Sequence, residues 1–258
     1  AILFFRLGDF YETFDGDAEV VARELEITLT SRPVSKGERV PLAGIPYHAL
    51  DSYLGKLIAM GYKVAICEQT EAPEKSKKIV ARAVVRVVTP GTVVEDNLLE
   101  TGANNYLAAL LPANGSCGLG YVDVSTGEFG CLQGTPEEVA RELERLSPAE
   151  LLLPPGVQPP AGTGATLTPL PEPVGSPQSL ATGLAKYFGS AGLEMVGLAG
   201  QPLAAAAAGL IIEYLQEHQK AVLGHINRIT PGRAGEHMGL DANTLRNLEL
   251  FDTLRRGE

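Results

Sequence analysis

The stretch ILFFRLGDFYETFDGD, residues 2–17, decides how the N-terminal part of the chain folds. The apolar run from Ile2 to Arg6 predicts a β-strand, and Gly8-Asp9 interrupts it. Asp15-Gly16-Asp17 then opens a helix, because the apolar residues that follow recur on one helical face. The segment between Gly8 and Gly16 therefore joins a strand to a helix.

An extended conformation of this segment puts Phe10 and Glu12 on one face and Tyr11 on the other. A buried glutamate needs a partner, so an aromatic ring and a carboxylate on a common face are an unusual core pair. Most phenylalanines of globular domains are nevertheless core residues. An exposed Phe10 could instead slide between base pairs from the minor groove, with Glu12 holding the disturbed base. The residues alone leave both interpretations open, and Tyr11 and Phe14 are core candidates in either.

Beyond this stretch, strands continue to alternate with helices, which indicates an α/β domain ending near Pro90-Gly91. The expected helix from His48 to Met60 carries apolar residues at helical spacing, and Gly61 ends it. The other expected elements are strands at Ile27–Thr30, Tyr62–Glu68 and Ala83–Thr89, and a polar loop from Ser31 to Val40.

The second part of the chain begins near Asn104 and predicts a ribonuclease-H-like core, in which three antiparallel-type strands precede a helix and another strand. Thr135, Pro136 and Glu138 form the capping-box signature of that helix. The expected strands are Tyr106–Leu111, Gly118–Val124, Glu128–Leu132 and Leu151–Leu153. The segment from Pro154 to Pro177 is expected to be mostly loop, and helices are expected near Leu180–Phe188, Pro202–Gln219 and Asn243–Arg255.

Charge is distributed unevenly along the 258 residues. The net charge of −10 argues against a nucleic-acid partner, but residues 1–91 carry 12 basic and 12 acidic side chains and are neutral. The acidic excess therefore lies in the second part, which DNA would repel. Basic clusters at Arg32–Arg39 and Lys75–Arg86 can still contact phosphates.

Cys67, Cys117 and Cys131 form no CxxC pair, so the sequence supports neither disulfides nor a zinc site and indicates a reducing, cytoplasmic setting. The Ala-rich run from Pro202 to Ile212 is too short to span a bilayer and predicts a buried helix. The chain starts at Ala1 inside an apolar stretch, and its last expected helix has no cap signal. We therefore expect a piece of a longer protein.

Motifs of familiar enzyme chemistry are absent, since the sequence holds no GxxxxGK[ST], HExxH or GxSxG pattern. No catalytic residue and no metal ligand is expected. A ribonuclease-H-fold nuclease is the enzyme alternative, with Asp123 and Glu128 as the suggestive acidic pair for a two-metal site. A protein-interaction module that uses the acidic second part, with Phe10 in the core, is the other alternative.

The run FRLGDFYE, residues 5–12, resembles the mismatch-recognition motif of bacterial MutS proteins. Similar blocks follow in the same order: PLAGIPYHA at 41–49, VAICEQ at 64–69, VTPGT at 88–92 and LDANTLRNLE at 240–249. The resemblance spans nearly the whole chain and is weakest from Pro154 to Gly200. It implies an α/β fold with a mixed-sheet mismatch-recognition domain (1–95) and a ribonuclease-H-like, three-layer connector domain (103–228). The start of a helical core or lever region (229–258) would follow.

In this family the phenylalanine of the Phe-x-Glu pair stacks on a mispaired or unpaired base in kinked DNA, and the glutamate hydrogen-bonds that base. The resemblance implies these roles for Phe10 and Glu12. It also implies contacts to the DNA backbone for Arg32, Ser35, Lys36 and His48.

The resemblance further implies partners outside this chain. The connector domain is expected to relay signals to the ATPase and to a MutL-type partner. The full-length family protein is a homodimeric, DNA-dependent ATPase that uses ATP and Mg. This chain itself is expected to be no enzyme, to hold no cofactor and to have no membrane partner. Its expected location is the bacterial cytoplasm, associated with the nucleoid.

Overall fold

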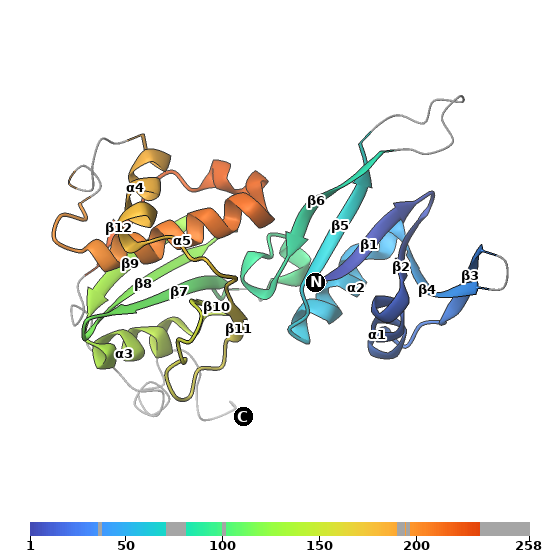
Figure 1. The fold of residues 1–258 in the computed structure, drawn as a ribbon, viewed down its shortest axis with the longest axis horizontal. Coiled ribbons are helices and arrows are strands. Elements are labelled where there is room, and N and C mark those ends of the chain that lie inside the picture. Colours follow the sequence, from blue (N-terminus) through green and yellow to red (C-terminus); the bar gives the residue numbers. More distant parts are fainter. Residues whose placement is uncertain (36–37, 71–80, 100–101, 190–193, 195–196, 233–258) are drawn as a thin grey trace, which may run out of the picture. The chain divides into compact units, whose positions relative to one another are not determined.

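The computed structural model describes residues 1–35, 38–70, 81–99, 102–189, 194 and 197–232, and its elements form two six-stranded sheets with helices packed on them (Figure 1). Both parallel and antiparallel strand pairs occur, which confirms the predicted mixed α/β class. Contacts group residues 1–107, 122–128 and 212–227 into one compact unit and the rest into a second. The helix predicted at Asn243–Arg255 lies outside the described residues.

The first sheet has the strand order β3-β4-β2-β1-β5-β6. Its centre is an antiparallel hairpin of β1 (Ile2–Leu7) and β2 (Phe10–Phe14), which confirms the predicted break at Gly8-Asp9. Gly8 has a φ of 61°, a left-handed conformation that glycine adopts at no steric cost. The other strands are β3 (Thr30–Ser35), β4 (Glu38–Pro46), β5 (Val64–Gln69) and β6 (Arg82–Val88).

Helices α1 (Asp15–Leu25) and α2 (Leu50–Ala59) cover one face of the first sheet. Their buried residues share one hydrophobic cluster with alternate side chains of the strands, among them Phe4, Tyr11 and Ile45. Because side chains alternate along a strand, the neighbours of these core residues in sequence point to the opposite face. This packing fixes which side chains of β2 can face outward.

The segment predicted as a loop from Ser31 to Val40 belongs to a β-hairpin, so that prediction and the strand at Ile27–Thr30 were wrong. Strand β3 begins at Thr30 and pairs antiparallel with β4, with Arg32 opposite Val40. Cross-strand hydrogen bonds here outweigh the low strand propensity of the sequence. Pro33 lacks an amide proton, but it is tolerated because β3 is an edge strand.

The helix predicted from His48 starts later than expected. Tyr47–Ala49 form a 3-10 turn, and α2 begins at Leu50. Further 3-10 turns lie at Pro90–Thr92, Asp96–Leu98 and Lys220–His225.

The second sheet has the order β11-β10-β7-β8-β9-β12, the arrangement expected of a ribonuclease-H-like core. Three consecutive strands are neighbours, and β10, which follows helix α3, lies on the far side of β7. Figure 1 shows α3 on one side of this sheet and α4 and α5 on the other, which gives three layers. The elements are β7 (Tyr106–Ala113), β8 (Ser116–Asp123), β9 (Glu128–Gly134), α3 (Pro136–Leu146), β10 (Glu150–Leu153), β11 (Thr166–Pro169), α4 (Pro177–Tyr187), α5 (Pro202–His218) and β12 (Thr230–Pro231).

Local signals explain most of this second sheet. The capping box of α3 is confirmed, because the Thr135 amide donates to Glu138 Oε2 at 2.8 Å and the Glu138 amide donates to Thr135 Oγ1 at 3.3 Å. The segment from Pro154 to Pro177 is mostly loop, as predicted, but it also contains β11, parallel to β10. A strand of four residues is too short to produce a periodic signal in the sequence.

None of the described helices is long and apolar enough to cross a membrane. The three cysteines are buried and unbridged.

Glycines let helix α5 approach strand β8 closely. A Cβ atom on Gly118 would lie 2.1 Å from the Leu203 carbonyl oxygen, and one on Gly120 would lie 2.8 Å from the Ala208 nitrogen. Both contacts are to backbone, which cannot rotate away as a side chain can. The helix and the sheet therefore require glycine at both positions.

Gly118→Ala is accordingly expected to lower the free energy of unfolding by about 1–3 kcal/mol, the usual cost of overpacking. Urea unfolding measures this change. Gly164→Ala is the matched control, because its Cβ would have no atom within 4 Å. It is expected to shift stability by less than about 0.5 kcal/mol. Equal stabilities of the two variants would contradict the packing.

Candidate nucleic-acid interface

Phe10 is an exposed aromatic residue on a strand that is paired on both sides. It opens β2, opposite Leu7 on one side and Pro46 on the other. Its exposed fraction is 47%, whereas that of Tyr11 is 5%. The alternation predicted for this segment is confirmed, and the interpretation of Phe10 as a core residue is wrong.

Glu12 shares the face of Phe10 and lies between Phe5 of β1 and Gly44 of β4. Its Oε2 atom is buried and accepts no hydrogen bond from the described residues. The Arg32 guanidinium forms an ion pair with it at 3.8 Å, which is too long for a hydrogen bond. Since native proteins satisfy nearly all buried polar atoms, this oxygen is an acceptor available to a ligand.

Gly44 keeps the surface between ring and carboxylate open. A Cβ atom there would lie 3.5 Å from Glu12 Cγ and 3.9 Å from Phe10 Cδ1. Any larger side chain would stand between the two groups. The sequence contains Gly44 in a conspicuous block, but only the strand register places it beside Glu12.

The hairpin turn that carries Phe10 is attached to the 3-10 turn that precedes α2. The Tyr47 amide donates to the Asp9 carbonyl at 2.9 Å. Arg6 Nε donates to the Gly8 carbonyl at 2.6 Å, and its guanidinium lies 3.8 Å from the centre of the Tyr47 ring. Sequence reasoning did not single out Arg6, because a cation on a strand carries no signal of its partner.

The structure describes the side chains of only some of the other residues implied by the family resemblance. Arg32 is exposed and lies near Glu12 through their ion pair. His48 is exposed in the 3-10 turn, with its ring 5.8 Å from that of Tyr47 in an edge-to-face arrangement. Ser35 ends β3 opposite Glu38, and its side chain lies outside the described part, as does Lys36.

Asp123 and Glu128, the acidic pair of the nuclease alternative, both accept hydrogen bonds from neighbouring residues. Asp123 is buried and accepts hydrogen bonds from the Asn105, Ser125 and Thr126 amides and from the Ser125 hydroxyl. Glu128 accepts from Tyr106 and Asn104. Among the described residues, no group of three or more His, Cys, Asp or Glu side chains could hold a metal ion. Asp123 therefore stabilises the turn after β8, and nothing described completes a two-metal site.

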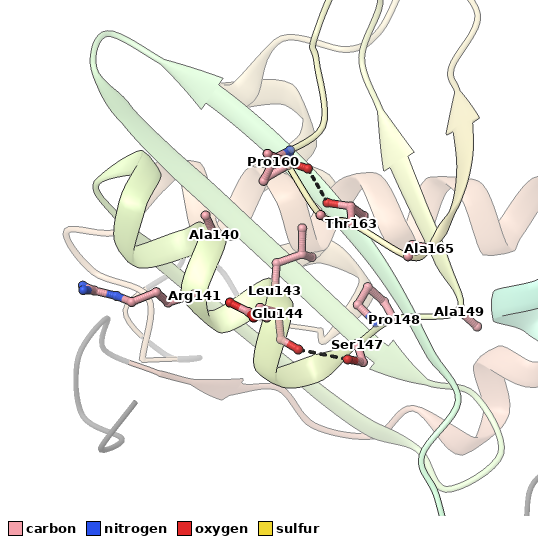
Figure 2. A pocket seen from close by; sticks show the side chains of 13 residues that line it. Ala140, Arg141, Leu143, Glu144, Ser147, Pro148, Ala149, Pro160, Thr163 and Ala165 are labelled. Atoms are coloured by element: carbon pink, nitrogen blue, oxygen red, sulfur yellow. Dashed lines mark hydrogen bonds between the residues drawn. The ribbon is translucent and has the colours of Figure 1, made fainter. Parts of the chain in front are cut away.

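A cavity of about 510 Å³ in the second unit lies between helix α3 and the loop from Pro160 to Ala165 (Figure 2). Its hydroxyls are turned onto nearby backbone: Ser147 Oγ donates to the Glu144 carbonyl and Thr163 Oγ1 to the Pro160 carbonyl. These side chains form no convergent polar group of the kind that binds a small molecule.

Comparison with known proteins agrees with this geometry. Models of MutS domain I and MutS domain II match residues 1–97 and 105–227. The chain is 49% identical to the DNA mismatch repair protein MutS of Dehalococcoides mccartyi (strain CBDB1) over 253 residues, which are 97% of this chain and 30% of that protein. It is 47% identical to the protein of the same description from Symbiobacterium thermophilum over 272 residues, with 99% and 31% covered.

The fold and these matches define a two-domain α/β protein of the mismatch-repair class. The chain belongs to the MutS family and carries its domains I and II. It spans about 30% of the length of the curated relatives that it resembles. The boundaries at residues 95 and 103 stay a prediction.

Tyr11 anchors β2 from below the site. Its hydroxyl donates to the Glu68 carboxylate of β5, and burial, followed by this hydrogen bond, raises the pKa of Tyr11 from 10.0 to about 12. The folded state therefore keeps the hydroxyl protonated at a pH where the unfolded chain has lost the proton. This preference stabilises the fold below pH 10, and the stabilisation is lost as the pH rises to about 12.

Tyr11→Phe is expected to lower the free energy of unfolding by about 1 kcal/mol at neutral pH, since it removes one hydrogen bond. The difference between the native chain and the variant should shrink between pH 10 and 12, because only the native chain holds the raised pKa. Urea unfolding at a series of pH values measures both effects. A difference that stays constant up to pH 12 would rule out the raised pKa.

Proposed function

We propose that this chain recognises mismatched or unpaired bases in duplex DNA and thereby initiates mismatch repair. Phe10 enters the minor groove and stacks on the mispaired base, Glu12 hydrogen-bonds that base, and the DNA is kinked. The observation that carries the proposal is the exposed Phe10 ring beside a buried Glu12 oxygen that has no hydrogen-bond donor among the residues that the structure describes.

Base unstacking explains why such a pair favours defective DNA. Inserting a ring between bases costs a few kcal/mol, and less where pairing is already defective. Glu12 accepts a hydrogen bond from a base donor, or donates one when protonated, so it can hold a base that the ring has displaced. The pair therefore senses how easily DNA deforms and not which sequence it has.

Phe10→Ala in the intact protein is expected to reduce the ratio of mismatched to matched duplex affinity by about tenfold or more, because base–aromatic stacking contributes about 1–3 kcal/mol. Fluorescence anisotropy with a single-mismatch duplex and its matched counterpart measures the ratio. Met60→Ala is the control, since Met60 is also exposed, at the end of α2. An unchanged ratio for Phe10→Ala would refute the proposed function.

Glu12→Gln and Glu12→Ala separate hydrogen bonding from charge. The amide of Gln can both donate and accept, so Glu12→Gln is expected to keep more mismatch affinity than Glu12→Ala. Anisotropy titrations between pH 6 and pH 8.5 measure both. Equal losses for the two variants at every pH would exclude a hydrogen bond from Glu12 to the base.

Arg32 is proposed to contact a DNA phosphate, since it is exposed on β3 and only loosely paired. Arg32→Ala should weaken binding to matched and mismatched DNA alike and reduce the slope of log affinity against log salt by about 0.9. Binding titrations at several salt concentrations test this. A loss confined to mismatched DNA would instead assign Arg32 to base recognition.

The resemblance alone supports the remaining parts of the proposal. Lys36, Ser35 and His48 would contact the DNA backbone, and the connector domain would relay DNA binding to a MutL-type partner and to an ATPase outside this chain. ATP, Mg and the homodimer belong to the full-length family protein.

A further inference from the structure

We propose that Arg6 and Tyr47 form a brace that holds the Phe10 turn at a fixed position, so that Arg6 acts as a positioning residue for mismatch discrimination. This inference rests on the proposed function, because it concerns the same Phe10 ring. In this proposal, Arg6 and Tyr47 affect discrimination by holding the turn in place, and they do not contact the base.

The turn itself has few restraints of its own. Gly8 and Asp9 are exposed, and a Cβ atom on Gly8 would have no atom within 4 Å. The ladder between β1 and β2 begins at the Leu7–Phe10 pair, so Phe10 is the first paired residue after the turn. The Phe10 ring cannot insert between bases if the hairpin bends when the ring contacts the base stack.

The brace supplies the missing restraint from two sides. Arg6 Nε donates to the Gly8 carbonyl at 2.6 Å, which fixes the first residue of the turn. The Tyr47 amide donates to the Asp9 carbonyl at 2.9 Å, which fixes the second. The Arg6 guanidinium lies 3.8 Å from the centre of the Tyr47 ring and thereby joins the two attachments.

Arginine suits this position better than lysine. A planar guanidinium can stack on an aromatic face and donate from its edge at the same time, whereas an ammonium cannot. The stack leaves Tyr47 46% exposed, so the cation–π contact lies at the surface and not in the core. The Tyr47 ring is also in edge contact with His48, which limits its rotation. Loss of the stack should therefore loosen the turn. Arg6 also lies 5.5 Å from the centre of the Tyr11 ring, so Tyr47→Ala, which leaves that contact in place, isolates the effect of the stack.

The test compares four forms of the intact protein: native, Arg6→Met, Phe10→Ala and the double variant. Arg6→Met is expected to reduce the mismatched-to-matched affinity ratio by about fivefold, the size of a partly exposed cation–π contact. It should cause no further reduction in the Phe10→Ala background, because a brace acts only through the ring that it positions. A 2-aminopurine base beside the mismatch should show a smaller rise in fluorescence with Arg6→Met, since its unstacking depends on Phe10.

Lys56→Met is the matched control. Lys56 also lies over a tyrosine ring of this domain, Tyr53, at 5.6 Å, and its loss removes the same charge without touching the turn. Its affinity ratio is expected to equal that of the native protein. Tyr47→Phe should retain the native ratio because it keeps the ring, whereas Tyr47→Ala should behave like Arg6→Met. This pair also tests the brace if Arg6→Met fails to fold.

The outcomes separate the brace from the proposed function. A native ratio for Arg6→Met or Tyr47→Ala, together with a loss for Phe10→Ala, would overturn the brace alone. An unchanged ratio for Phe10→Ala would overturn the proposed function. Equal weakening on both duplexes, with a shallower salt dependence, would show that Arg6 contacts phosphate and would overturn the brace. An additive loss in the double variant would overturn action through Phe10.

Discussion

The site depends on the burial of Tyr11 in the middle of a paired strand. Strand β2 is hydrogen-bonded to β1 on one side and to β4 on the other, so it cannot rotate about its axis. Tyr11 enters the core beneath helices α1 and α2, and its hydroxyl is held by Glu68. Because side chains alternate with a period of two, this one anchor forces Phe10 and Glu12 onto the opposite face. A slip of one residue would bury Glu12 and expose Tyr11, so the register that makes the core also makes the site.

The same arrangement carries local costs that stability alone does not justify. An exposed phenylalanine contributes less to folding than a buried one, and a buried carboxylate oxygen without a donor is unfavourable by about 1–3 kcal/mol. Gly44 adds to this, since a glycine inside a strand offers no side chain to pack. The register of β2 and β4 brings together three residues that stability alone does not favour: Phe10, Glu12 and Gly44. Such a combination is typical of a binding site and not of a packing error.

Much of the fold could be predicted from the sequence, because its signals are local. The break at Gly8 and the capping box of α3 each lie within a few residues. The hairpin of β3 and β4 could not, since its strands are held by partners and not by propensity, and neither could β11. For the site as well, some residues could be predicted from the sequence and others could not. Alternation placed Phe10 and Glu12 on one face. The family resemblance was needed to favour a DNA-contacting Phe10 over a core Phe10. Gly44, Arg6 and Tyr47 join the site only through strand register and turn geometry, which one sequence does not encode in any short pattern.

The composition of the site also limits what it can read. Base-specific readout in DNA uses side chains such as arginine or asparagine that form two hydrogen bonds to one base edge. Phe10, Glu12 and Gly44 offer instead one aromatic ring, one carboxylate and an open glycine surface between them. A ring stacks on any base, and a carboxylate accepts a hydrogen bond from any base donor within reach, so neither group distinguishes sequences well. Under the proposed function, this pair distinguishes the free energy needed to open the stack, which is lower at a mismatch. Such a sensor discriminates only if its own position is fixed more firmly than the base pair that it tests. Rigid attachment of the Phe10 turn is therefore a requirement of the recognition itself.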